Sequence, residues 1–251
     1  MHACLRDGRG RREGPFRSRK GLATMMIADG ILVADKEKGM TSHDVVSLVR
    51  RRYRLKKVGH AGTLDPNATG VLVLLLGKAT KLSGTFLNED KEYIATMKLG
   101  ENTSTGDSEG EVTAAGEVSC SPEEAAAAVS AFRGEMDQVP PMVSAKKIGG
   151  KKLYKLARKG IEVKREPRKI FISEMEVLEV SIPVVVFRTV CSKGTYIRQL
   201  AQDIGTQLGC GAHLAELRRI RSGSFGIDRA VPVSVLKRIG PEELNEKIIR
   251  V

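Results

Sequence analysis

The chain has 251 residues, of which 41% are hydrophobic, and it carries a formal net charge of +12 at pH 7. This length allows one large or two small domains with a real hydrophobic core. The longest apolar run, Val71–Leu76, is far too short to cross a membrane, and no apolar region of the needed length follows the basic N-terminus. We therefore expect neither a membrane span nor a signal peptide.

The positive charge is concentrated in two segments. Residues 1–20 contain seven Lys or Arg and two acidic residues, and residues 141–169 contain eleven and two. Together they carry +14, so the rest of the chain has a net charge of −2. Local positive charge of this kind is typical of phosphate binding, and we expect a polyanionic partner. The alternative is a solvated helix face and a flexible tail.

The four cysteines give no sign of a metal site. Cys4, Cys120, Cys191 and Cys210 are scattered without a CxxC pair, and only Cys210 and His213 lie close together. Structural zinc needs clustered thiolates or imidazoles. We expect no metal, free thiols and a reducing, cytoplasmic location.

The N-terminal region precedes the first regular pattern. Residues 1–24 have no periodic apolar residues and are predicted to be a disordered basic tail, followed by one folded domain over 25–251. Met25 and Met26 stand just before the first strand-like run, so we hypothesise that natural translation starts at one of them.

Two helical patterns separate three strand patterns in the first half of the chain. The capping box formed by Thr41 and Asp44 begins a helix that is expected to run to about Arg54, with arginines at its end. A second helix should follow the apolar run and end near Leu87. The predicted strands are Gly30–Ala34, Val71–Leu76 and Glu92–Leu99.

The second half alternates less regularly. The polar, glycine-containing segment 102–110 predicts a loop, and Ser121 with Pro122 begins a helix. Apolar residues at helical spacing predict a further helix over 195–208. Strand patterns cover 169–180, 184–191 and, with mixed character, 213–225. This order predicts an α+β (mixed α/β) fold.

One loop could present a carboxylate to a substrate. Asp65 precedes a proline, which keeps it out of the helical region, and Gly59, Gly62 and Gly70 surround it. By spacing alone an ordinary turn is the favoured interpretation. A nucleophile or general base is the alternative, and metal-dependent phosphotransfer is disfavoured because no acid follows before Glu89.

Three other residues could carry chemistry, and each has an ordinary structural explanation. Arg198 could hold a carboxylate ionised, or it could be a solvated arginine. Tyr93 could stack on a base and move a proton, or fill the core as a strand tyrosine. His60 could replace a base in a stack, or lie on the surface.

Several motifs together resemble one family. The segment GHAGTLDPNATG (59–70) resembles the signature loop of the TruB-type tRNA pseudouridine synthases, which isomerise uridine 55 in the T loop. The resemblance covers about residues 29–238. Its other motifs are DKEKGMTS (35–42), KEY (91–93) with Leu99-Gly100, QVPP (138–141), Ser144-Ala145, 154–160, CSKGTYIR (191–198), GCGAHL (209–214) and LRR (217–219).

The resemblance assigns a role to each matching residue. Asp65 would be the catalytic aspartate, Arg198 its ion-pair partner, and Tyr93 the aromatic residue under the target base and its proton-transfer group. His60 would take the place of the flipped base in the T loop. Lys36 and Leu217 would line the pocket. In the basic insertion, we predict that Lys151 and Lys152 contact RNA.

The resemblance also implies an architecture and a partner. It implies a mainly antiparallel central sheet flanked by helices, with 25–251 as the catalytic domain and 141–169 as a flexible, RNA-gripping insertion. Val143 departs from the aromatic residue usual in the family. We expect the T-arm of tRNA as partner, a monomer, no cofactor, and no separate C-terminal RNA-binding domain. Isomerisation changes no oxidation state and adds no group.

Two further hypotheses stand beside a tRNA uridine isomerase that flips its target base. A non-catalytic RNA-binding protein or tRNA-folding chaperone could use the same cleft. An aspartyl phosphotransferase would depend on magnesium. Substitution of Asp65 separates the isomerase from the chaperone, because only the isomerase needs this carboxylate.

Overall fold

The computed structural model describes residues 27–251, apart from 145–146, 149–150, 154–155, 157–159 and 162. The predicted tail 1–24 and the two candidate start methionines lie outside the described residues. No helix in the described part of the chain is long and apolar enough to span a membrane.

Strands and helices alternate along the whole described chain. The strands are β1 (Gly30–Lys36), β2 (Val58–His60), β3 (Thr69–Leu76), β4 (Lys91–Leu99), β5 (Glu101–Thr103), β6 (Val112–Ala115), β7 (Gly134–Gln138), β8 (Lys147–Ile148), β9 (Lys151–Lys152), β10 (Arg168–Ser181), β11 (Val184–Cys191), β12 (Ala212–Ser222), β13 (Phe225–Gly226) and β14 (Val231–Pro232). The helices are α1 (Ser42–Arg52), α2 (Ser83–Leu87), α3 (Pro122–Ala131), α5 (Ile197–Gln207), α6 (Val233–Leu236) and α7 (Pro241–Lys247), with the 3-10 turns η1 (Gly77–Leu82) and η2 (Ile227–Arg229).

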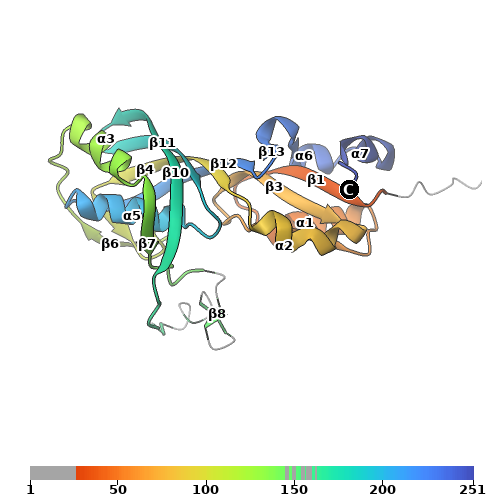
Figure 1. The fold of residues 1–251 in the computed structure, drawn as a ribbon, viewed down its shortest axis with the longest axis horizontal. Helices are drawn as coiled ribbons and strands as arrows, with labels where there is room; N and C mark the ends of the chain where they lie inside the picture. Colours follow the sequence, from red (N-terminus) through yellow and green to blue (C-terminus); the bar gives the residue numbers. More distant parts are fainter. Residues whose placement is uncertain (1–26, 145–146, 149–150, 154–155, 157–159, 162) are drawn as a thin grey trace, which may run out of the picture.

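One ten-stranded sheet runs the length of the molecule. Its order is β14-β1-β3-β12-β4-β11-β10-β7, with β2 on β3 and β13 on β12. The β1–β14 and β3–β12 pairs are parallel and the others antiparallel. Helices α1, α2, α6 and α7 gather at one end, and α3 and α5 at the other (Figure 1). The predicted α+β fold with a mainly antiparallel sheet is confirmed.

The two ends of the sheet join at a short seam. Strands β3 and β12 pair through Thr69 with Arg218 and Gly70 with Arg219. Gly70 has φ +99°, and a Cβ there would lie 2.1 Å from the Arg219 carbonyl oxygen, so a side chain cannot fit. The seam therefore brings the loop before β3 beside the centre of β12 and β4.

The sequence explains the elements that flank this seam. Strand β3 is apolar on both faces because each face is buried, and its alternate residues belong to two different hydrophobic clusters. Helix α1 has the predicted capping box, with Thr41 and Asp44 each accepting from the other's backbone. The apolar stripe of α5 is buried through Ile197, Ala201 and Ile204.

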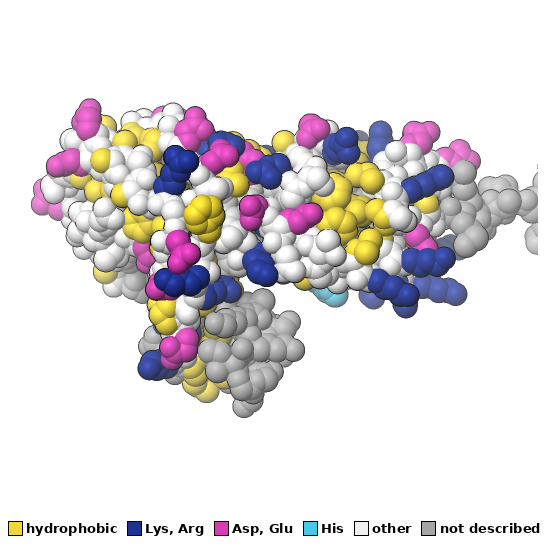
Figure 2. Space-filling model, in the orientation of Figure 1, with side chains coloured by type: hydrophobic (Ala, Val, Ile, Leu, Met, Phe, Trp, Pro, Cys, Tyr) yellow, Lys and Arg dark blue, Asp and Glu magenta, His cyan; other side chains and the backbone are white. Residues whose placement is uncertain are grey.

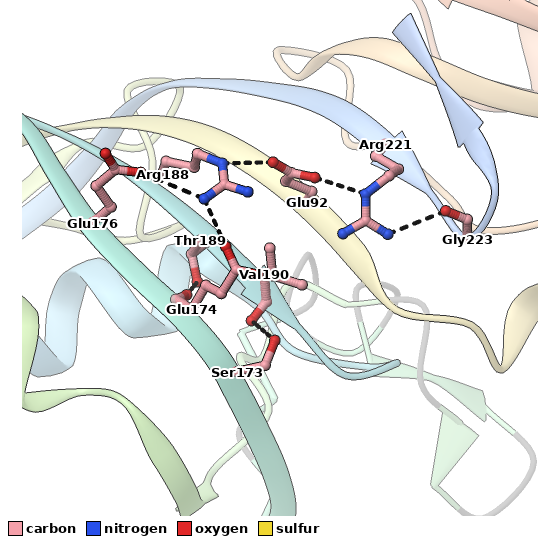
Figure 3. Close-up of polar contacts among 9 residues, drawn as sticks. All are labelled: Glu92, Ser173, Glu174, Glu176, Arg188, Thr189, Val190, Arg221 and Gly223. Carbon is pink, nitrogen blue, oxygen red and sulfur yellow. Dashed lines mark hydrogen bonds and ion pairs between the residues drawn. The ribbon is translucent and has the colours of Figure 1, made fainter.

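An ionic network braces the sheet behind β4. Glu92 accepts from Arg188 of β11 at 2.6 Å and from Arg221 of β12 at 2.7 Å, and Arg188 also contacts Glu174 of β10 (Figure 3). Partial burial acts to raise the pKa of the Glu92 carboxylate. The hydrogen bonds from the two arginines outweigh this effect, and the pKa is lowered. The network spans four strands and fixes β4, which carries Tyr93 on its other face.

The structure differs from the sequence prediction in two places. The predicted loop 102–110 is wrong at its start, because β5 extends to Thr103 and pairs with β6. The predicted single helix ending at Leu87 is a 3-10 turn, η1, followed by the five-residue α2. These are short elements of three to six residues, for which local propensity is a weak guide.

Candidate active site

The loop that carries Asp65 is held by the first strand and the first helix. Ser42 at the start of α1 exchanges two hydrogen bonds with the backbone of Leu64, at 2.8 and 3.0 Å. The Asp65 carbonyl accepts from Ala68 N, and the Pro66 carbonyl accepts from Gly39 N. This is a tight turn, as the spacing predicted, and it presents the Asp65 side chain with 43% of its surface exposed.

Lys36 fixes the same loop from beneath. Its side chain is fully buried, and Nζ donates to the carbonyl oxygens of Glu37, Met40 and Pro66 at 2.6–3.0 Å. It does not appear among the residues that line the cavity described below. Lys36 therefore lies beside the Asp65 turn rather than in the wall of the cavity. Its hydrogen bond to the Pro66 carbonyl fixes this turn to β1.

Lys36 should make the stability of the protein depend on pH. Burial lowers the pKa of Lys36 to about 8, from an ordinary value of 10.5. Between these values the unfolded chain binds more protons, so this group should make the free energy of unfolding rise with pH from about 8 to about 10.5.

Urea unfolding of the parent and of Lys36→Met across this range measures the effect. The variant should lose the rise. It should also be less stable by about 1–3 kcal/mol, since buried carbonyls lose their donor. Equal pH slopes in the two proteins would contradict the burial argument.

Arg198 at the start of α5 organises the site. Its side chain is 5% exposed, and Nε lies 3.0 Å from Asp65 Oδ2. Nη1 and Nη2 each donate at 2.8 Å, to the carbonyls of Thr105 and Val143. A guanidinium with this many fixed acceptors cannot rotate freely, so the ion pair predicted for Asp65 has a defined direction.

A second carboxylate lies on the other side of Arg198. Asp107 Oδ2 is 3.5 Å from Nη1, and Oδ1 accepts from Thr105 Oγ1 and from Glu109 N. No sequence motif assigns a role to this loop. A charged residue two positions after Thr105 is not a distinctive sequence pattern. Asp107 comes close to Arg198 through its pairing with Leu214 of β12.

The electrostatics of Asp65 come from opposing effects. Removal from water by the surrounding protein raises the pKa of Asp65, and Arg198 acts in the opposite direction. Asp107 raises the pKa of Asp65 further through like charge. The net effect is a raised pKa, so the Asp65 carboxylate is more basic than that of an ordinary aspartate.

Tyr93 on β4 forms another wall of the site. Its side chain is 9% exposed. Burial raises the pKa of Tyr93, against the effect of the nearby Arg219 guanidinium, so its hydroxyl stays protonated at neutral pH. Arg219, 1% exposed, donates from Nε to the Val71 carbonyl and from Nη2 to the Gly62 carbonyl. It thus ties β12 to the start of the Asp65 loop.

These groups surround one cavity of about 350 Å³. Asp65, Tyr93, Arg198 and Leu217 all line it, as does Arg219. The volume suits one flat ring with part of its sugar, because small-ligand pockets begin at about 300 Å³. The structure therefore brings together four residues that span 152 positions of the sequence, from Asp65 to Leu217.

His60 is placed next to this cavity rather than in its wall. It ends β2, pairs with Leu74 of β3, and lies two residues before Gly62, which does line the cavity. Burial lowers the pKa of His60, and Nδ1 is buried without a hydrogen-bond partner among the described residues. The ring is therefore neutral at pH 7.

The basic insertion is described in part. Its β8 and β9 pair as a two-stranded ribbon, which Figure 1 places beyond the ends of β7 and β10. Lys151 and Lys152 make up β9, and their side chains lie outside the description. Their RNA contact stays a prediction.

A metal site receives no support from the described residues. They contain no group of three His, Cys, Asp or Glu that could hold an ion. His213 Nδ1 lies 3.1 Å from the Glu101 carbonyl, and Cys210 Sγ donates to the Gly211 carbonyl. These two residues thus have separate backbone partners.

The sequence matches two models of known protein families. Residues 50–197 match the TruB family pseudouridylate synthase (N terminal domain), and residues 198–250 match the tRNA pseudouridylate synthase B C-terminal domain. The second region includes β12, which lies in the middle of the sheet described above.

Curated relatives cover most of the chain. The tRNA pseudouridine synthase B of Syntrophotalea carbinolica is 47% identical over 224 residues, which is 89% of this chain and 73% of the relative. The protein of the same name from Opitutus terrae is 46% identical over 224 residues, 89% of this chain and 93% of the relative.

Solved structures show the same fold. A chain of a Cbf5-Nop10-Gar1 complex is 33% identical with a TM-score of 0.68, covering 88% of this chain and 60% of that one. A chain of the archaeal box H/ACA sRNP Nop10-Cbf5 complex is 32% identical with a TM-score of 0.63, covering 84% and 53%. This chain thus spans a little over half the length of those solved chains.

Proposed function

The chain belongs to the TruB family of pseudouridylate synthases, and on that premise we propose that it converts uridine 55 in the T loop of tRNA to pseudouridine through Asp65. The family membership supports isomerisation of uridine in tRNA. The observation that carries the proposed site is the ion pair of Asp65 and Arg198 at the wall of a cavity that Tyr93 also lines.

Isomerisation of uridine requires one carboxylate and one flat surface against which the base can lie. The bond from C1′ of ribose to N1 of uracil breaks, the base turns, and a bond from C1′ to C5 forms. The C5 proton then leaves to solvent and N1 takes up a proton, so the product is an isomer of the substrate. The Asp65 carboxylate could add to the base or the sugar, or promote elimination across C1′–C2′. Arg198 occupies one oxygen of Asp65 and leaves the exposed part of the carboxylate for the nucleotide.

Tyr93 and Leu217 would hold the ring. Both line the cavity, and Tyr93 has the protonated hydroxyl that a proton transfer requires. Lys36 would act indirectly, because its hydrogen bond to the Pro66 carbonyl keeps the Asp65 turn in place.

The target base must leave its stack to reach Asp65, which costs on the order of a few kcal/mol. A neutral aromatic ring could offset part of this by filling the gap in the T loop. His60 is neutral and only half-buried, and it lies next to the cavity, so we assign it this role. We further propose that the protein acts as a monomer in the cytoplasm on the T-arm of tRNA.

Cations suited to phosphate lie at two places. The last turn of α1 carries exposed Arg50 and Arg51, and the residues after it include exposed Arg54, Lys56 and Lys57. Figure 2 shows Lys and Arg gathered at the α1 end of the face in view. The insertion adds Lys151 and Lys152. RNA hairpins are recognised largely by shape and backbone, which suits cations on either side of a cavity.

Neutralising two insertion lysines should flatten the salt dependence of RNA binding. For Lys151→Gln with Lys152→Gln, the slope of log K against log salt should become shallower by about 1.5, since each lost phosphate contact is worth about 0.7–0.9. Filter binding of T-arm RNA over a range of salt measures this.

The matched control neutralises two cations that belong to neither of these groups. These are Arg133, which follows α3, and Lys98 in β4, which pairs with Glu101 at 2.7 Å. Their slope should equal that of the parent. If the insertion variant also kept the parental slope, the insertion would not contact phosphates.

Release of the C5 hydrogen tests the proposed function. A T-arm RNA labelled with tritium at C5 of its uridines should release label from one uridine per molecule, and a transcript with cytidine at position 55 should release none. Release that persists with the cytidine transcript would move the reaction to another uridine. No release from either RNA would overturn the isomerase assignment.

A further inference from the structure

Tyr196 forms part of the cavity wall two residues before Arg198. It is the N-cap residue of α5, and its side chain makes no capping hydrogen bond. Gln138, 1% exposed, instead holds the backbone of Tyr196 from outside the helix. Its Nε2 donates to the Tyr196 carbonyl at 3.0 Å, and its Oε1 accepts from Tyr196 N at 2.8 Å.

The ring of Tyr196 has a partner of its own. The Arg168 guanidinium carbon lies 4.8 Å from the ring centroid, a stacking distance, and Nη2 donates to the Gly194 carbonyl. Space for the guanidinium depends on Gly194, where a Cβ would lie 3.1 Å from Nη1. Backbone and ring of Tyr196 are therefore fixed by two different side chains.

Gln138 and Arg168 are paired with each other in the sheet. Gln138 is the last residue of β7 and Arg168 the first of β10, and their Cα atoms are register partners. The basic insertion leaves the sheet after Gln138 and returns at Arg168. A further residue of the insertion, Val143, accepts from Arg198 at 2.8 Å through its carbonyl.

We propose that Gln138 and Arg168 are positioning residues, which hold Tyr196 at the wall of the Asp65 cavity and make its placement depend on the root of the basic insertion. The proposal rests on the proposed function, because the cavity must be the catalytic one. It gives the insertion a second task besides phosphate contact. RNA bound to the insertion aligns the cavity wall through Gln138 and Arg168, the residues at which the chain leaves the sheet and returns to it.

Single-turnover kinetics with Arg168→Met test the catalytic part. Methionine keeps the length of the side chain but removes the planar cation. The rate of pseudouridine formation in bound RNA should fall roughly tenfold to a hundredfold, the scale of a small misplacement in a site, while RNA affinity changes by less than about twofold. Gln138→Leu should behave in the same way, and Arg168→Lys should recover part of the rate.

The matched control is an arginine outside the insertion, at the other end of β7 from Gln138. Arg133 is exposed, and its Nε donates to the Ser173 carbonyl at 3.0 Å. Arg133→Met should leave the rate unchanged. A bound-RNA rate for Arg168→Met within about twofold of an active parent, or a loss confined to affinity, would overturn the proposal.

A readout that needs no activity separates this inference from the proposed function. The chain contains four tyrosines, so fluorotyrosine labelling gives few fluorine resonances, and Tyr196→Phe identifies the one from Tyr196. Arg168→Met should move that resonance and Arg133→Met should not. If the parent forms no pseudouridine but the resonance moves, the proposed function fails and the coupling to Tyr196 stands. If the resonance does not move, the coupling itself is wrong.

Discussion

Asp65→Asn should reduce pseudouridine formation in T-arm RNA by at least about 10³-fold, on the scale of losing a positioned proton-transfer group or nucleophile. Asparagine keeps the size of the side chain but cannot attack or take a proton. Binding should change little, because Arg198 is retained by the carbonyls of Thr105 and Val143. Single-turnover assays with purified protein, together with filter binding, measure both quantities.

Asp107→Asn is the matched control for this substitution. It removes the other carboxylate beside Arg198, which lies 3.5 Å from Nη1 and is 11% exposed, without changing Asp65. We expect a much smaller loss of rate. If both variants lost activity equally, the two carboxylates would act as a pair rather than Asp65 alone, and turnover by Asp65→Asn near the parental rate would remove Asp65 from the chemistry.

Arg198→Gln should have the next largest effect, roughly a 10²–10³-fold loss in kcat/KM, comparable with losing one fixed electrostatic contact in a catalytic site. Its pH dependence gives the sharper test. Arg198 lowers the pKa of Asp65, so removing it raises that pKa. Less Asp65 is then ionised at a given acidic pH, and the acid limb of kcat/KM should move to higher pH.

Two variants serve as controls for this shift. Arg198→Lys keeps the charge but loses the fork, so its acid limb should move less than that of Arg198→Gln. Arg218→Gln removes an arginine from a different pair, with Asp35 Oδ2 at 2.8 Å, and should leave the limb unchanged. An unchanged limb in Arg198→Gln would mean that the titrating group is not Asp65.

Much of the fold could be predicted because its long elements carry strong local patterns. The capping box at Thr41 and the apolar stripe of α5 both have the structure that their spacing predicted. The apolar run of β3 was also identified as a buried strand. By contrast, β7 has no clear alternation, and its partner β10 begins thirty residues after it ends, so only the assembled sheet defines it.

The site could be predicted in part for a similar reason. Asp65 stands out because Pro66 and the glycines around it signal a tight turn, whereas the meeting of Asp65 with Arg198 depends on tertiary structure. A solvated arginine was one of the two interpretations of Arg198, and the structure instead buries this side chain. Arg219 was named only within a motif, and Asp107 was not singled out, because a buried charge is revealed by its partners rather than by its neighbours in sequence.

Reverse-transcription mapping of pseudouridine in full-length tRNA tests the central claim most directly. The parent protein should produce a single new modification at position 55, and the Asp65→Asn protein, at the same concentration and bound to the same tRNA, should produce none. A modification at another uridine, or one at position 55 that persists in Asp65→Asn, would contradict the account.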